Sequence, residues 1–148
     1  MDTRLEKQVS SLELSKQLKE LGVKQESLFY WQYFHDTDDD GRMSEYKLYN
    51  IDNLYSGKDD GYSAFTVAEL GEMLPKFIWY KNLKEDDKKN YHLYIKKLVD
   101  CWLINYLWNE NGRFISLGKE QVSKTEADAR AKMLIYLIEN KLMDIKNA

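Results

Sequence analysis

The chain has 148 residues and a formal net charge of −3, with its 22 basic and 25 acidic residues interspersed. This balance argues against duplex DNA as a partner, because neutralising phosphates usually requires a basic face. The length favours one domain over residues 1–148, and a single cysteine, Cys101, excludes an intramolecular disulfide.

The N-terminus has charged residues in place of the apolar stretch that a signal peptide needs. The longest strictly apolar run, Met133 to Ile138, is far shorter than a membrane span. We therefore expect a cytoplasmic protein without a membrane partner.

The first predicted helix runs from about Leu12 to Leu21. Its apolar stripe consists of leucines at helical spacing: Leu14, Leu18 and Leu21. Two serines before it are candidate N-caps, Ser10 and Ser11. Gly22 is expected to adopt the left-handed conformation that ends the helix, so that Val23 packs on Leu18 in a Schellman arrangement.

An aromatic segment follows, from Ser27 to Phe34, and its residue types favour a pleated sheet. Both alternating sets of this segment are apolar. It therefore predicts either a strand covered on both faces or one that exposes aromatic rings to a partner. The polar stretch H-D-T-D-D-D-G-R is expected to be a hairpin tip before a return strand from Met43 to Ile51.

The hairpin tip contains the opening of an EF-hand calcium loop, formed by Asp36, Asp38, Asp40 and Gly41. The last position of such a loop should hold a bidentate glutamate, and Lys47 stands there instead. The segment before the tip is also predicted as a strand, where an EF-hand needs a helix. A polar tip closed by Asx-turns is the favoured interpretation, and the three aspartates are an alternative calcium site.

The second predicted helix has a complete N-terminal signature. Thr66 and Glu69 form a capping box, and Phe65 and Leu70 occupy the positions of a hydrophobic staple. Pro75 then limits this helix to about two turns.

Four further strands are predicted: Phe77 to Tyr80, Tyr91 to Ile95, Trp102 to Leu107 and Phe114 to Leu117. A helix from Leu93 to Leu107 is an alternative for the middle of this region. The stretch N-E-N-G-R before the last strand is a turn signal, and Gly118 to Lys124 is predicted as a loop.

The C-terminal helix has the clearest signals in the sequence. Thr125 can accept a hydrogen bond from the N–H of Asp128, whose carboxylate can reach back to the N–H of Thr125. Behind this cap, apolar residues recur at helical spacing: Ala127, Ala131, Leu134, Ile135, Ile138 and Leu142.

These elements predict a single α+β domain. We expect one antiparallel sheet of four to five strands, covered by about three helices, in the order α-β-β-α-β-β-β-α. The C-terminal helix is expected to be its main cover.

The sequence contains no recognisable motif for catalysis or cofactor binding. The two histidines, His35 and His92, have no metal-ligand spacing and no nucleophile or zinc-hydrolase context. Gly112 to Glu120 departs from a phosphate-binding P-loop, because Glu120 stands where a hydroxyl should hold magnesium. We therefore expect no catalytic residue, no bound metal and no cofactor.

Aromatic residues on predicted strands are the remaining functional candidates. A possible interaction surface consists of Trp31, Tyr33, Tyr49 and Trp79, since tryptophan and tyrosine often anchor protein interfaces. A sheet that stacks single-stranded bases on its rings is the alternative, although no RNP-type motif is present. Most other rings are expected in the core.

Three segments together resemble a known group of proteins: Leu12 to Trp31, Ala64 to Pro75 and Thr125 to Asn140. They cover about a third of the chain and resemble a family of small uncharacterised proteins encoded by phages, prophages and mobile elements of Bacteroides-like bacteria. Lys141 stands where similar sequences often carry a helix-ending glycine. The resemblance implies a phage-type bacterial context and no activity.

Our functional hypothesis is a small non-enzymatic interaction protein of phage or prophage origin with a protein partner. The alternatives are a single-stranded nucleic-acid binder and a calcium-binding domain that uses Asp36, Asp38 and Asp40.

Overall fold

The computed structural model describes residues 4–34, 45–80 and 88–147. Its α-helices are α1 (Leu12–Glu20), α2 (Val67–Met73) and α3 (Glu126–Glu139), and short 3-10 helices lie at Glu6–Gln8, Ile51–Asn53, Lys58–Asp60 and Ile145–Asn147. Its strands are β1 (Phe29–Phe34), β2 (Glu45–Asn50), β3 (Gly61–Ser63), β4 (Phe77–Tyr80), β5 (Lys89–Lys97), β6 (Trp102–Glu110), β7 (Arg113–Ser116) and β8 (Gln121–Ser123).

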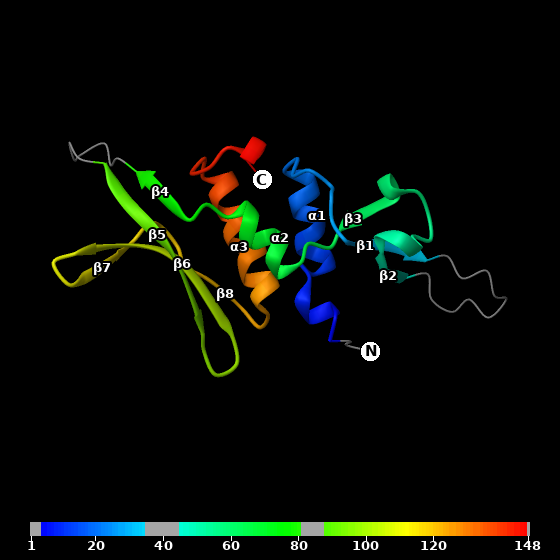
Figure 1. The fold of residues 1–148 in the computed structure, drawn as a ribbon, viewed down its shortest axis with the longest axis horizontal. Helices are drawn as coiled ribbons and strands as arrows, with labels where there is room; N and C mark the ends of the chain where they lie inside the picture. Colours follow the sequence, from blue (N-terminus) through cyan, green and yellow to red (C-terminus); the bar gives the residue numbers. More distant parts are fainter. Residues whose placement is uncertain (1–3, 35–44, 81–87, 148) are drawn as a thin grey trace.

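The strands form two antiparallel sheets with the helices between them (Figure 1). The small sheet has the order β2-β1-β3, and the large sheet has the order β4-β5-β6-β7, with β8 also paired to β6. The α+β class and the three predicted α-helices are confirmed, but the single sheet is wrong. Two sheets form because β3 pairs with the free edge of β1, with Ser63 opposite Tyr30, and α2 then separates β3 from β4 in the chain.

The predicted order of elements is corrected as well, because β3 is an additional strand and β8 lies in the predicted loop from Gly118 to Lys124. Each has only three residues, too few for an alternating pattern to be recognised. The helical alternative for Leu93 to Leu107 is wrong. Here β5 and β6 form a hairpin, and the Leu98 N–H donates to the Cys101 carbonyl at 2.8 Å in its turn.

The helix α1 ends in the predicted Schellman motif. Gly22 has a φ of 87°, and its N–H donates to the Lys19 carbonyl at 2.9 Å. The N–H of Val23 donates to the Leu18 carbonyl at 3.0 Å, and both of these side chains are buried. These are the two bonds that define the motif.

The helix α3 ends in the same way, but at a residue that carries a side chain. Lys141 has a φ of 56° and donates its N–H to Ile138 at 3.1 Å, while Leu142 donates to Leu137 at 2.8 Å. The cap geometry is therefore kept with lysine at the position that favours glycine.

The capping box of α2 is confirmed, with both hydrogen bonds between Thr66 and Glu69 present. The Glu69 carboxylate also accepts the Ser27 hydroxyl and the Leu28 N–H, each at 3.0 Å. A residue expected to cap a helix thus also ties α2 to the start of β1.

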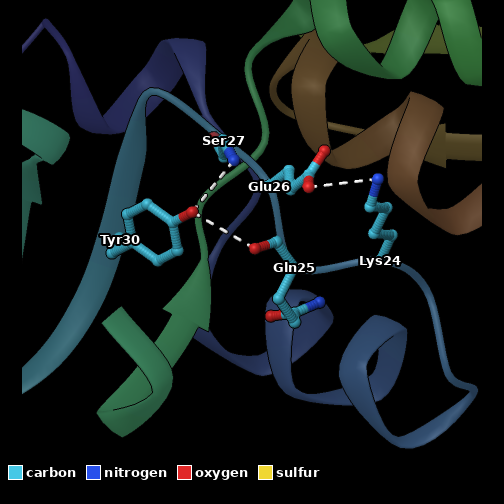
Figure 2. A network of polar contacts seen from close by, with 5 residues as sticks. All are labelled: Lys24, Gln25, Glu26, Ser27 and Tyr30. Carbon is cyan, nitrogen blue, oxygen red and sulfur yellow. Dashed lines mark hydrogen bonds and ion pairs between the residues drawn. The ribbon is translucent and has the colours of Figure 1, made fainter. Parts of the chain in front are cut away.

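The turn between α1 and β1 is held by polar contacts within it (Figure 2). The Tyr30 hydroxyl donates to the Gln25 carbonyl and accepts the Ser27 N–H, both at 3.2 Å. Lys24 and Glu26 form an exposed ion pair at 3.1 Å, which adds little to stability at such exposure.

Only half of the predicted capping box of α3 forms. The Thr125 hydroxyl accepts the Asp128 N–H at 3.1 Å, but the Asp128 carboxylate accepts the N–H of Ser11 at 2.7 Å. Ser11 is the N-cap of α1, and its partly buried N–H needs an acceptor. Asp128 therefore joins the first turns of α1 and α3, a contact across 117 positions that local spacing could not predict.

The hydrophobic core lies between the helices and one face of the large sheet, here called the inner face. The buried residues of α3 are Ala127, Ala129, Ala131, Met133, Leu134, Ile135 and Leu137. Ile104 and Tyr106 on β6 are buried against this layer, and the Tyr106 hydroxyl donates to the Pro75 carbonyl at 2.6 Å. Burial raises the pKa of the Tyr106 hydroxyl.

Candidate interaction surface

The four aromatic residues proposed from the sequence do not form one surface. Trp31 and Tyr33 share one face of β1, whereas Tyr49 on β2 pairs with Tyr30 and therefore lies on the opposite face. Trp79 belongs to β4 in the large sheet, on the other side of the helices (Figure 1). The proposed set is thus divided between two sheets and three faces.

The face that holds Trp31 and Tyr33 is in contact with the N-terminal part of the chain. The Trp31 indole N–H donates to the Ser10 carbonyl at 2.9 Å. Tyr33 packs edge-on against Tyr46 with ring centroids 5.2 Å apart, and the Lys16 Nζ of α1 lies 4.7 Å from the Tyr46 ring centroid.

A second lysine of α1 contacts the same face. The Lys19 Nζ lies 5.1 Å from the Tyr62 ring centroid and donates to the Gly61 carbonyl at 2.8 Å. Desolvation raises the pKa of Tyr46, and the neighbouring Tyr62 adds to the rise. These rings are therefore engaged by cations of the same chain, which favours a structural role for them.

The opposite face of the small sheet is covered by the segment between β2 and β3. The Tyr55 ring lies 5.1 Å from that of Phe34 and 6.1 Å from that of Tyr49. Beneath it, the fully buried Gln32 amide donates to the Ser56 carbonyl at 3.2 Å and accepts the Ser56 N–H at 3.1 Å. Tyr49 is therefore a packing residue, and desolvation raises its pKa.

The large sheet differs, because no described element packs on its second face, here called the outer face. The strand registers direct these side chains to it: Phe77, Trp79, Asn90, His92, Tyr94, Lys96, Leu103, Asn105, Leu107, Asn109, Phe114, Ser116 and Val122. The helices lie on the inner side in Figure 1.

The outer face carries the two most exposed Phe, Tyr or Trp rings of the described residues, those of Phe114 and Trp79. The exposed fractions are 48% for Phe77, 59% for Trp79, 41% for Tyr94 and 70% for Phe114. The Phe77 ring lies 6.4 Å from that of Trp79 and 6.3 Å from that of His92. Several solvent-exposed rings on one sheet face mark a binding surface more often than isolated exposed residues do.

A row of side chains crosses the outer face from one edge strand to the other. Phe77 is opposite His92, His92 is opposite Leu107, and Leu107 is opposite Ser116. Three strand spacings of about 4.8 Å make this row roughly 14 Å wide. The face is therefore broad enough to receive more than a single side chain.

The charge of the outer face departs from that of the whole chain. Its side chains in the five described strands include no aspartate or glutamate, and Lys96 is their one lysine. The chain as a whole has more acidic than basic residues. Depletion of carboxylates around aromatic residues is typical of the centre of an interface.

Polar groups of the outer face are only partly paired. The Ser116 hydroxyl donates to the side-chain Oδ1 of Asn105 at 2.8 Å. The buried Oδ1 of Asn90, opposite Trp79, has no hydrogen-bond partner in the described part of the chain. Because this oxygen is buried, it is not a contact point for a bound molecule in this structure.

A groove of about 860 Å³ lies between α1, α3 and the segment before α3. Its polar side chains already link these elements. Besides the bond from Ser11 to Asp128, Lys132 donates to the Val122 carbonyl at 3.0 Å, and the Tyr136 hydroxyl accepts the Lys119 N–H at 3.2 Å. The groove is thus a junction of structural contacts.

The weak calcium candidates, Asp36, Asp38 and Asp40, lie outside the described residues, so the calcium alternative stays a prediction. Within residues 4–34, 45–80 and 88–147, no three His, Cys, Asp or Glu side chains are grouped to hold a metal ion. His92, the histidine that is described, lies on the outer face beside Phe77.

Comparison with known proteins gave no match to a family model, to a curated protein or to a solved structure. Among the described helices, none has the length and apolar composition of a membrane span.

The sequence interpretation missed three residues of the outer face: Phe77, Tyr94 and Phe114. Tyr94 could have been found by counting alternate residues from the core strands, since it lies between Leu93 and Ile95, which face inward. Phe114 follows the Asn111–Gly112 turn, whose positive φ values of 52° and 86° fix a two-residue hairpin. The two-residue turn sets the strand register, from which the outer-face position of Phe114 could have been predicted.

Proposed function

We propose that this chain is a small non-enzymatic interaction protein that binds a protein partner through the outer face of its large sheet. The observation that carries the proposal is the set of exposed rings on this face, with Trp79 and Phe114 at 59% and 70% exposure. Burying such rings removes apolar area from water, worth about 25 cal/mol per Å².

The chemistry of the outer face fits a protein partner. Tryptophan, tyrosine and phenylalanine are the residues that interfaces concentrate at their centres, where carboxylates are depleted. Asn109 and Ser116 at the margin of the face are exposed, and they supply the polar rim that such interfaces have.

The remaining parts of the proposal rest on the sequence. The resemblance to proteins of phages and mobile elements supports a phage or prophage origin. Asp128, Lys132 and Tyr136 in the groove between α1 and α3 are engaged in structural hydrogen bonds, which supports a structural role for these three side chains.

Site-specific cross-linking tests the outer face. A photoreactive benzoylphenylalanine replaces Phe114 in one variant and Val99 in another. Val99 is a matched control, because it is fully exposed but lies in the turn between β5 and β6. In a host lysate, a discrete cross-linked protein is expected from position 114 and not from position 99. Equal cross-linking from both positions, or none from either, would contradict the proposal.

Single-stranded nucleic acid is a second candidate for the same face. The observation that favours it is the absence of carboxylates among outer-face side chains of the described strands, together with Lys96 and His92 among exposed rings. Bases stack on such rings for about 1–3 kcal/mol each. A labelled oligonucleotide should then bind at about 50 mM salt and dissociate as salt rises; no binding at low salt removes this candidate.

A further inference from the structure

The strand β4 is the edge of the large sheet, and one of its sides is unpaired by any described strand. The N–H of Leu93 donates to the Lys76 carbonyl at 2.9 Å, which shows that Lys76 directs its backbone groups at β5. Because this direction alternates along an antiparallel strand, Phe77 and Trp79 direct their N–H and C=O groups to the free edge.

Within β4 itself, F-I-W-Y, this edge has no lysine, proline or bulge of the kind that natural edge strands use against association, and it pairs in unbroken register with β5. Pro75 and Lys76 come immediately before it. Phe77 and Trp79, whose backbone groups face outward, are also 48% and 59% exposed at their side chains. The edge therefore offers both hydrogen-bonding groups and apolar contact area.

A groove of about 460 Å³ runs beside this edge. Three consecutive residues of β4, Phe77, Ile78 and Trp79, line it. Because successive side chains of a strand point to opposite faces, a groove that contacts all three lies along the edge and not on either face.

The other residues that line the groove are apolar, apart from two carboxylates. The apolar residues come from the end of α2 and from the segment after α3: Met73, Pro75, Leu142 and Met143. Glu72 and Asp144 line the same groove. Methionine side chains adapt to different apolar ligands, and the two carboxylates favour a cation nearby.

We propose that a short extended segment of a partner protein adds to β4 as a new strand. Its backbone pairs with the outward N–H and C=O groups of Phe77 and Trp79, its alternate apolar side chains enter the groove, and a lysine or arginine beside them meets Glu72 and Asp144. This mode of recognition takes affinity from main-chain hydrogen bonds and selectivity from alternate side-chain pockets. The inference rests on the proposed function, which it extends from the outer face to the edge of the same sheet.

A peptide series tests this strand addition on the intact protein. The probe alternates valine and threonine over five residues and carries two lysines at each end. One control peptide has glutamates in place of the lysines, and another keeps the lysines but is N-methylated at all five central residues. Amide NMR shifts report the position of binding. We expect binding of the lysine peptide at or below about 1 mM, with the largest shifts at Phe77 and Trp79.

The control peptides test backbone pairing and the charge contact separately. N-methylation removes the donors that pair with the edge, so a loss of at least about tenfold in affinity is expected. The glutamate peptide should bind more weakly than the lysine peptide, because its charges meet Glu72 and Asp144. Equal binding of the N-methylated and lysine peptides, or no shift at Phe77 and Trp79 at about 1 mM peptide, overturns strand addition.

Two variants at one position locate the effect in the protein. Trp79→Ala removes the indole alone, and Trp79→Pro also removes the outward N–H, which β5 does not use. Affinity for the lysine peptide should fall further with Trp79→Pro than with Trp79→Ala, and equal affinities of the two variants contradict backbone pairing. If Trp79→Pro fails to fold, the N-methylated peptide still decides the question with the unaltered protein.

The outcome is separable from that of the proposed function. Peptide binding at β4 without cross-linking from position 114 means that the edge is used and the outer face is not. Cross-linking from position 114 without peptide binding retains the outer face and removes strand addition.

Discussion

Both sheets of this molecule are rich in aromatic residues, but the rings differ in how far other parts of the chain pack on them. In the small sheet, lysines of α1 lie over Tyr46 and Tyr62, and Tyr55 packs on Tyr49 from the other side. In the large sheet, one face forms the core with α3 and the other exposes Trp79 and Phe114. The exposure of an aromatic strand therefore depends on whether other described segments of the chain pack on it.

The difference has a topological cause. The helix α1 precedes the small sheet and the connection between β2 and β3 lies within it, and both pack back on the sheet. The described turns of the large sheet, between β5 and β6 and at Asn111 and Gly112, are too short to cover a sheet face. The helices, which are long enough to do so, lie on its inner side (Figure 1).

The largest expected effect concerns the contact between α3 and the segment that follows β7, on the inner side of the large sheet. Gly118 has a φ of 75°, and a Cβ there would collide with the Tyr136 hydroxyl of α3. We expect Gly118→Ala to lower the free energy of unfolding by about 3 kcal/mol, from backbone strain plus displacement of the ring. Urea unfolding measures the change.

A matched glycine in the same sheet provides the control. Gly112 has a φ of 86°, but nothing lies within 4 Å of a Cβ added there. Gly112→Ala should therefore cost only the strain, about 1 kcal/mol. Equal losses for the two variants would mean that the contact with α3 does not hold the sheet.

The cover of the small sheet can be released by one substitution. Gln32 is fully buried and forms hydrogen bonds with the segment over Tyr49. Gln32→Ala is expected to cost about 2 kcal/mol, because its partners lose their bonds. Hydrogen exchange should show faster exchange at Ser56, whose N–H loses its acceptor. Gln121→Ala is the control, since its amide makes one exposed bond of 3.3 Å; a loss of similar size there would contradict the assignment.

The inner face of the large sheet predicts a dependence on alkaline pH. The raised pKa of Tyr106 means that the folded protein keeps this phenol neutral when the unfolded chain, with a pKa of about 10, releases its proton. The stabilisation is complete below about pH 10 and is lost as pH rises above it, at about 1.4 kcal/mol per pH unit.

Tyr106→Phe should remove this component of the alkaline slope. At neutral pH it should cost only about 1 kcal/mol, for the hydrogen bond to the Pro75 carbonyl. Unfolding curves between about pH 9 and 11 measure both effects. An unchanged alkaline slope in the variant would show that Tyr106 does not titrate differently in the folded and unfolded states.

The smallest effect is expected on the outer face. Trp79→Ser and Phe114→Ser remove rings that are 59% and 70% exposed, so each should change the free energy of unfolding by less than about 0.5 kcal/mol. Thermal unfolding measures this. A loss of about 2 kcal/mol or more from either variant would show that its ring is covered, and the comparison between the sheets would fail.

Local signals in the sequence were sufficient for the helix ends. The capping box at Thr66 and the Schellman motif at Gly22 depend on residues within one turn, and both are present. The carboxylate of Asp128 was assigned to a local bond and instead accepts the N–H of Ser11. Long-range contacts of this kind have no signal in the spacing of residues.

The division into two sheets could not be predicted from the sequence either. Alternation identifies a strand but not the edge that it pairs with, so β3 joining β1 could not be inferred from Gly61–Ser63 alone. The same limit applies to the candidate surface. Trp79 was named correctly as a strand residue that could be exposed, but Tyr49 has an equally aromatic setting and is covered by Tyr55.

Hydroxyl-radical footprinting of the isolated protein, read by mass spectrometry, tests the central claim most directly. We expect rapid oxidation of Trp79, Tyr94 and Phe114 on the outer face, and slow oxidation of Tyr30 and Tyr106, which are buried. Oxidation of Trp79 and Phe114 as slow as that of the two buried tyrosines would contradict it, because the outer face would then be covered like the faces of the small sheet.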